Sequence, residues 1–237
     1  MGRMAGQDER DEEAEQQLLH RYLGREAAQA VTAGRLHPDA IGSVQPCCVL
    51  FADIRHFSLL TEQVSVTMLR RLLSDFFQLF VASIEEQGGE VNKFLGDGAL
   101  ALFTPSSAPA AMAAVTAALQ LHAQFQQLRN QWMELAGAHA QASATGQLVE
   151  VDLSVGISHG NIFVGSIGRG KRLDYTAIGS AVNIAQRLAA DANAGGVYCC
   201  GRVRKQLDGS IQSRALGCRQ PRGMTTELAL FQLVAKS

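Results

Sequence analysis

The sequence lacks net charge and long hydrophobic runs, and each absence excludes a class of protein. Its 237 residues carry a formal net charge of −1, so no global field would attract nucleic acid or an anionic membrane. No apolar run approaches the ~20 residues of a membrane span, and the N-terminal segment has no apolar signal-peptide core. We therefore expect a cytoplasmic globular protein with no membrane span and no nucleic-acid partner. Any polyanionic ligand must be held by a local site.

Cysteine spacings typical of zinc sites and disulfide frameworks are also missing. The chain has five cysteines, an odd number, and four of them form the adjacent pairs Cys47-Cys48 and Cys199-Cys200. No C-x-x-C spacing occurs, and both pairs lie in apolar, strand-like segments where cysteine behaves as a small hydrophobe. This pattern is typical of a reducing compartment.

The chain divides by composition into two short N-terminal segments and one large domain. Residues 1–17 are polar and acidic, which predicts disorder. Residues 18–45 carry apolar positions at helical spacing and predict a linker helix. The remaining residues, 46–237, form the predicted domain. Hydrophobic residues make up 47% of the whole chain, which is ample for a core.

The pattern of apolar residues predicts the elements of this domain. An unbroken apolar run ends at Asp53 and predicts a strand buried on both faces. A long helix follows, capped by Ser65 and stopped by Gly88-Gly89. Next we expect a hairpin over 90–104, a second helix over 112–135, a loop over 136–147 and a strand over 148–160 with its antiparallel return over 161–168. A short helix over 180–190, a strand over 195–200 and weaker strands complete the chain.

This order predicts an α+β fold of the ferredoxin-like type. The succession β-α-β-β-α-β packs two helices on one face of an antiparallel sheet, here with strands added at the C-terminus. In that topology the end of the first strand lies beside the hairpin that joins the second and third. Asp53 ends the first strand and Asp97 lies at the hairpin tip, so the two carboxylates should meet.

The hairpin segment "NKFLGDGALALF" (92–103) supports more than one interpretation. An Asp-Gly pair between apolar runs is a strong hairpin signal, and Asp97-Gly98 read alone is only a turn. Asp53 read alone is a strand-ending cap. Together the two carboxylates suit Mg²⁺, which takes one or two carboxylates and completes its shell with water and phosphate oxygens.

Two further segments carry groups suited to a nucleotide. "IRHFS" (54–58) offers main-chain N–H groups where a short helix begins, a natural phosphate cradle. Asn183 and Arg187 are four apart on a predicted helix, so an amide and a guanidinium share one face. Lys171 and Arg172 precede them and could reach phosphates. The alternative is a solvated helix face and a solvated loop, the usual place for exposed cations.

Three segments, "VLFADIRHFS", "NKFLGDGALALF" and "DYTAIGSAVNIAQRLA", resemble the signature segments of class III nucleotidyl cyclases. They follow the family order at family-like separations, and the resemblance covers residues 46 to 200. It implies the class III cyclase fold and a head-to-tail homodimer whose sites combine residues of both chains. The N-terminal helix is similar to helices that join such domains to upstream sensory modules, which implies a sensory domain elsewhere.

The resemblance also implies roles for individual residues. Asp53, Ile54 and Asp97 would hold two Mg²⁺ or Mn²⁺ ions. Lys93 and Thr176 would select the base. Asn183 would orient the ribose and Arg187 would stabilise charge on the α-phosphate. Phe57, Ser58, Lys171 and Arg172 would complete the substrate site.

The base-selecting pair favours ATP as substrate and cyclic AMP as product. Thr176 stands where many members have a second aspartate, similar to the subgroup related to bicarbonate-responsive cyclases. Guanylyl cyclases typically carry an acid at the lysine position, which here is Lys93. Two alternatives stay open: a cyclase that uses GTP, and a silent nucleotide-binding module that regulates a partner. A diguanylate cyclase would need a G-G-[DE]-E-F hairpin, which this sequence lacks.

Overall fold

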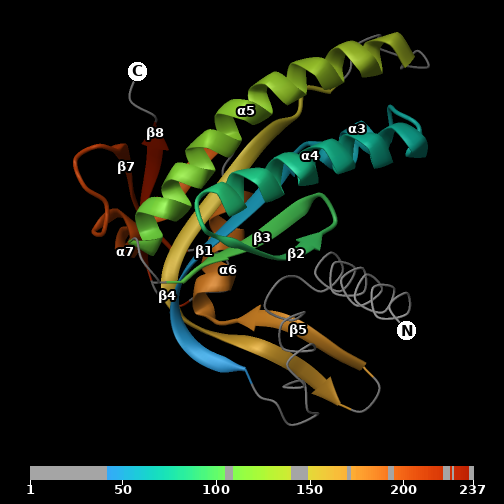
Figure 1. Cartoon of the computed structure of the whole chain (residues 1–237). Coiled ribbons are helices and arrows are strands. Elements are labelled where there is room, and N and C mark those ends of the chain that lie inside the picture. Colours follow the sequence, from blue (N-terminus) through green and yellow to red (C-terminus); the bar gives the residue numbers. More distant parts are fainter. Residues whose placement is uncertain are drawn as a thin grey trace, which may run out of the picture. The chain divides into compact units, whose positions relative to one another are not determined.

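The computed structural model describes residues 42–104, 109–139, 149–169, 172–191, 195–220, 225 and 227–234 (Figure 1). The predicted acidic N-terminus and nearly all of the predicted linker helix lie outside these residues. The chain forms two compact units, one of residues 1–45 with 163–178 and one of residues 46–162 with 179–237.

The larger unit contains the predicted β-α-β-β-α-β arrangement. Its strands follow the order β2-β3-β1-β4, continued by β6-β8-β7, and β1, β2 and β3 pair antiparallel as predicted. The added part differs, because β4 and β6 run parallel. The elements of this arrangement are β1 (Ser43–Arg55), α3 (Phe57–Thr61), α4 (Val66–Glu86), β2 (Glu90–Leu95), β3 (Gly98–Phe103), α5 (Ala110–His139) and β4 (Asp152–Arg169). They are followed by β5 (Arg172–Ile178), α6 (Ser180–Ala190), β6 (Gly196–Cys200), α7 (Gly201–Arg204), β7 (Gln212–Arg219) and β8 (Leu228–Val234).

Helix α4 begins and ends where its sequence predicts. The Ser65 hydroxyl accepts a hydrogen bond from the Met68 N–H at 3.3 Å, which satisfies one of the free donors of the first turn. The helix ends at Glu86, and Gly88 follows with a φ of 71°, a conformation that glycine adopts without strain.

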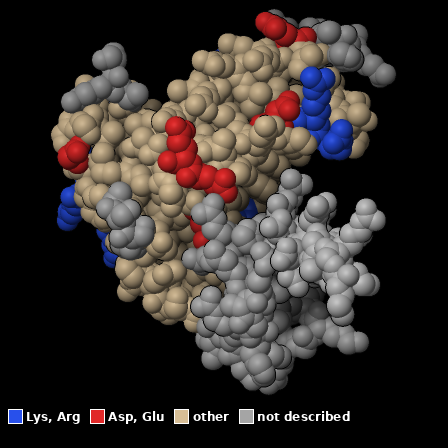
Figure 2. All heavy atoms as spheres, in the orientation of Figure 1, with Lys and Arg blue, Asp and Glu red and all other residues tan. Residues whose placement is uncertain are grey.

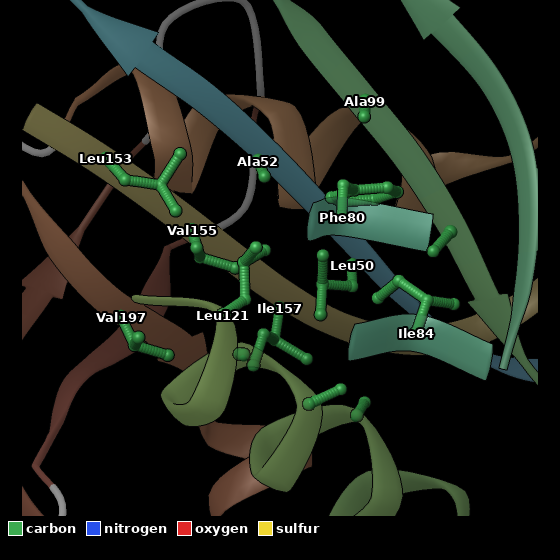
Figure 3. Close-up of a cluster of buried hydrophobic side chains, with 14 of the residues drawn as sticks. Leu50, Ala52, Phe80, Ile84, Ala99, Leu121, Leu153, Val155, Ile157 and Val197 are labelled. Atoms are coloured by element: carbon green, nitrogen blue, oxygen red, sulfur yellow. The ribbon is translucent and has the colours of Figure 1, made fainter. Parts of the chain in front are cut away.

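The core lies between one face of the sheet and helices α4 and α5 (Figure 3). Leu50 and Ala52 of β1 alternate with residues that face the other side of the sheet, as expected from the two-residue period of a strand. They meet Phe80 and Ile84 of α4, which are buried completely. This side of the sheet therefore has the helix-covered face that the sequence predicts.

The opposite face of the sheet is covered by α6, at a position where β4 has a glycine. A Cβ on Gly156 would overlap the carbonyl oxygen of Ala185 and lie 2.7 Å from the Ala189 nitrogen. The neighbouring Ser158 hydroxyl donates to the carbonyl of Ala181. Because Val155 points into the α4–α5 core, these contacts put α6 on the other side. The prediction that helices cover one face of the sheet is thus incomplete, because α6 covers the other face.

Three expected boundaries differ in the structure. Residues 161–168 do not return antiparallel, because β4 runs without a break from Asp152 to Arg169 and β5 makes the return. Helix α5 extends to His139, into the predicted loop. Strand β1 begins at Ser43, three residues before the predicted start of the domain.

The cysteines and the surface agree with the sequence analysis. Cys47, Cys48, Cys199 and Cys200 are buried free thiols, and Cys218 is free and exposed on β7. Figure 2 shows charges of both signs scattered over the described part of one face. None of the helices in the described ranges is both long and apolar enough to cross a membrane.

Candidate active site

The hairpin that carries Asp97 turns one residue earlier than the Asp-Gly signal indicates. Leu95 pairs with Gly98, so Gly96 and Asp97 are the two central residues of the turn. Gly96 has a φ of 66°, whereas Asp97 has no positive φ, which is the φ pattern of a type II′ turn. Asp97 therefore sits at the tip as predicted, while the glycine that makes the turn is the one before it.

Pairing between β1 and β3 brings Asp53 to this tip. Asp53 stands opposite Gly98 in the antiparallel ladder, next to Asp97 in sequence. A Cβ on Gly98 would lie 2.8 Å from the ring of Phe51 and 3.1 Å from the carbonyl oxygen of Ala52, closer than side chains pack. Glycine after Asp97 is thus required by the close approach of β1.

The Asp53 and Asp97 carboxylates interact electrostatically. Burial, and then the negative charge of Asp97, raise the pKa of Asp53 to about 6, while Arg55 opposes the rise. Burial also raises the pKa of Asp97, and a backbone hydrogen bond lowers it. Two carboxylates whose charged forms are disfavoured in the same place are suited to bind a cation, which removes the repulsion.

The donor set fits Mg²⁺ or Mn²⁺ that is shared with a phosphate ligand. Within the described ranges no group of three or more His, Cys, Asp or Glu side chains could hold a metal by itself. Two carboxylates are nevertheless enough for Mg²⁺, which usually keeps waters and takes substrate phosphates as its other ligands. The Ile54 side chain is 2% exposed and lies in the core, so Ile54 could contribute only its backbone carbonyl.

The predicted phosphate cradle is a short helix directly after β1. His56 has a φ of 61°, the only positive φ of a non-glycine residue among the described residues, and it ends the strand so that α3 can begin. The first N–H groups of a helix lack intrahelical partners and are free to meet an anion. Phe57 is buried in the core and Ser58 is exposed, so Phe57 could serve only through its backbone.

Helix α6 presents the second predicted pair of residues. Asn183 and Arg187 are both exposed and one turn apart, whereas Ala185 and Leu188 face the sheet. The i, i+4 spacing therefore places the amide and the guanidinium on one face of the helix, as predicted, and that face is exposed. Arg187 also lies in the last turn, where a cation is favoured by the helix dipole.

The two residues predicted to select the base, Lys93 and Thr176, belong to different units. Lys93 lies on β2 opposite Leu100, just after a bulge at Asn92. Thr176 lies on β5 opposite Gly165, in the smaller unit. Arg172 begins β5, and Lys171 lies outside the described residues.

Two features of the site were not predicted from the sequence. Arg55 follows Asp53 by two residues and contacts it, with 3.8 Å between its Nη1 and the Asp53 Oδ2 atom. The bulge at Asn92 buries the Asn92 Oδ1 atom without a described partner. The two-residue period of β1 could have predicted the first contact, whereas a single sequence carries no signal for the second.

Comparison with known proteins identifies the family. The family model of the adenylate and guanylate cyclase catalytic domain matches residues 40–233, which is most of the chain. The chain belongs to this family. Its ferredoxin-like core with C-terminal strands is accordingly the class III cyclase fold.

Individual relatives agree with the family match. The adenylate cyclase of Anabaena cylindrica is 30% identical over 62% of this chain and 27% of its own length. Adenylate cyclase 1 of Rhizobium meliloti is 29% identical over 80% of this chain and 28% of its own length. The chain thus spans less than a third of the length of these relatives.

Two solved structures share the fold over nearly their whole length. The adenylyl cyclase CyaB from P. aeruginosa superimposes with a TM-score of 0.72 at 28% identity, covering 82% of this chain and 96% of that one. The guanylyl cyclase Cya2 gives a TM-score of 0.70 at 23% identity, covering 83% and 95%. Since structures from both activities match, the fold does not decide between ATP and GTP.

Proposed function

We propose that the protein converts ATP to 3′,5′-cyclic AMP and pyrophosphate. The observation that carries this proposal is the convergence of Asp53 and Asp97 at the end of β1, with their charged forms destabilised until a cation arrives. When bound, Mg²⁺ or Mn²⁺ would lower the charge on the triphosphate and favour attack by the ribose 3′-hydroxyl on the α-phosphate. The family match supports the cyclase reaction.

The remaining residues have separate tasks in this proposal. Lys93 and Thr176 recognise the base, Asn183 orients the ribose, and Arg187 stabilises the charge that develops on the α-phosphate. The N–H groups of the Phe57 and Ser58 backbone, together with Lys171 and Arg172, are assigned to the phosphates. We also propose that the catalytic domain spans residues 46–237 and that a linker helix and a sensory domain precede it.

The proposed assembly is a head-to-tail homodimer in the cytoplasm. In the larger unit, Asn183 and Arg187 are exposed on the outside of α6, where a second chain can reach them. One chain would supply the two aspartates of each site and its partner would supply Asn183 and Arg187, giving two equivalent sites related by two-fold symmetry.

The second candidate function is a guanylyl cyclase, which the matching fold of Cya2 keeps open. A single experiment tests both. Purified protein is incubated separately with ATP and GTP in the presence of Mg²⁺ or Mn²⁺, and the products are separated by chromatography. Cyclic AMP from ATP supports the proposal, cyclic GMP as the main product supports the second candidate, and neither product supports a silent nucleotide-binding module.

A further inference from the structure

Arg55 connects the metal-binding end of β1 to the end of α6. Its Nη1 atom lies 3.8 Å from the Asp53 Oδ2 atom and donates a hydrogen bond of 3.1 Å to the carbonyl oxygen of Ala190. Ala190 is the last residue of α6, the helix that carries Asn183 and Arg187. One guanidinium therefore contacts both halves of the proposed machinery within a single chain.

The chemistry at both ends suits this connection. Carbonyls in the last turn of a helix lack intrahelical partners and carry the negative end of the helix dipole. A carboxylate is the other acceptor, and the planar guanidinium can serve two acceptors at once, which an ammonium does less well. Asp53 and Arg55 are two apart on β1, so they project from the same face of the sheet, the face that α6 covers.

The guanidinium is held in place and not merely solvated. The Arg55 side chain is 23% exposed, and its Nε atom is buried without a hydrogen-bond partner among the described residues. A buried donor without a partner is unfavourable, so the side chain is retained in this position at a cost in free energy. Arrangements that break a local rule in this way are found mainly at functional sites.

We propose that Arg55 is a positioning residue that fixes the Asp53 carboxylate relative to α6. This inference rests on the proposed function, in which Asp53 binds metal and α6 carries the groups that act on ribose and α-phosphate. In the proposed dimer those two halves of one chain serve different sites. Arg55 would therefore couple the geometry of the two sites through the chain they share.

The test compares Arg55→Met with a matched control, Arg129→Met. The Arg129 side chain is 22% exposed and its Nη1 lies 3.5 Å from the Glu150 Oε1 atom, so the control also removes a half-buried arginine and an ion pair. Arg129 lies on α5, outside the proposed site. Hydrogen exchange measured by mass spectrometry, Mn²⁺ affinity measured by electron paramagnetic resonance with 3′-deoxy-ATP present, and steady-state kinetics are compared with wild type.

For Arg55→Met we expect three changes. Amide exchange in the last turn of α6, residues 187–191, becomes about tenfold faster while exchange in α4 and α5 keeps its wild-type rate, because the substitution removes the hydrogen bond to Ala190 at the end of α6. Mn²⁺ affinity falls about fivefold, and kcat falls at least about tenfold while the KM for ATP changes less than about threefold. Arg129→Met keeps wild-type values in all three.

Other outcomes overturn the inference. If amide exchange in α6 of the Arg55→Met variant kept the wild-type rate, the contact with Ala190 would not stabilise the end of α6. Tighter Mn²⁺ binding without a change in exchange would make Arg55 only a charge that repels the cation. Faster exchange throughout the chain would make its role structural. The exchange measurement needs neither metal nor turnover, so it decides the inference even if wild type forms no cyclic nucleotide, the result that would refute the proposed function.

Discussion

Asp53 on β1 stands opposite Gly98 on β3, and this pairing brings the Asp53 carboxylate to the Asp97 turn. The relationship depends on a residue with no side chain, because a Cβ at Gly98 would meet the Phe51 ring at 2.8 Å. The first strand and the hairpin thus approach closely at the position next to the second carboxylate. The meeting of the two carboxylates at this point follows from the backbone pairing of β1 with β3.

The first prediction concerns the two carboxylates. Asp53→Ala and Asp97→Ala should each lower kcat more than the roughly 10- to 100-fold typical of groups that only orient a metal ligand, because each removes a ligand itself. Circular dichroism should show an unchanged fold. Substantial residual activity in either variant, with the metal dependence of wild type, would contradict the two-carboxylate site.

Asp53 should also reduce the stability of the metal-free protein above about pH 6. Its folded pKa of about 6 exceeds the unfolded value, so the unfolded state holds fewer protons between about pH 4 and 6 and stability falls as the pH rises through this range. Asp53→Asn cannot ionise and escapes this loss. With the shift discounted for partial exposure, we expect the variant to be about 1 kcal/mol more stable at about pH 8 and equal to wild type near pH 4.

Denaturant unfolding in EDTA at the two pH values measures this difference, with the exposed Glu62→Gln as a control that should show none. Addition of Mn²⁺ should stabilise wild type and not Asp53→Asn, since a cation binds only the intact pair in the folded state. An Asp53→Asn variant less stable than wild type at about pH 8 in EDTA would contradict the electrostatic account.

A third prediction concerns the packing of α6 against the sheet. Gly156→Ala places a Cβ against the Ala185 carbonyl and 2.7 Å from the Ala189 nitrogen, and backbone atoms cannot move aside as a flexible side chain does. We expect a loss of about 1–3 kcal/mol in the free energy of unfolding, together with lower kcat because Arg187 moves with the helix. Gly209→Ala is the control, since no atom lies within 4 Å of its Cβ position. Equal stability of the two variants would show that α6 does not pack closely against β4 at Gly156.

Much of this site could be predicted because it follows from local chemistry and general topology. Ser65 caps α4, Asn183 and Arg187 share a helix face, and the ferredoxin-like order alone brings Asp53 to the hairpin. These features depend on residue spacing or on the succession of strands and helices, both of which a single sequence contains.

The features that could not be predicted depend on contacts between distant segments. The sequence predicts an antiparallel return over 161–168, yet the chain stays extended there, with the Cβ position of Gly160 3.3 Å from the Ala181 side chain. The hydrogen bond from Arg55 to Ala190 joins residues 135 apart in sequence. Tertiary packing determines both the extended backbone at Gly160 and the contact of Arg55 with Ala190. The hydrophobic pattern of either segment alone carries no information about such packing.

The proposed dimer gives a fourth prediction. Asp53→Ala and Arg187→Ala should each be inactive alone, and mixing the two should restore activity, because a heterodimer has one site with both aspartates from one chain and Arg187 from the other. Activity should approach about a quarter of wild type when half of the dimers are mixed and each has one intact site of two. No recovery in a mixture shown to contain heterodimers would rule out a site built from two chains.

The last prediction concerns the choice of base. Lys93 carries only hydrogen-bond donors, whereas the Thr176 hydroxyl can donate or accept. Adenine has acceptors at N1 and N7 and a donor at N6, so an ammonium on a ring nitrogen and a hydroxyl that accepts from N6 satisfy it. Guanine has donors at N1 and N2, which a carboxylate would satisfy better than an ammonium. An unpaired buried donor costs about 1–3 kcal/mol, which corresponds to roughly a ten- to hundredfold preference.

We therefore expect kcat/KM for ATP to exceed that for GTP by about ten- to a hundredfold in wild type, and Lys93→Glu to move the ratio toward GTP. Steady-state kinetics with both nucleotides measure the ratio, and Lys205→Glu, in the turn after α7, provides a control with the same change of charge. A shift confined to Lys93→Glu places Lys93 at the base, whereas an equal shift in both variants makes it an effect of net charge. Preference of wild type for GTP would reverse the substrate assignment and leave the cyclase reaction itself in place.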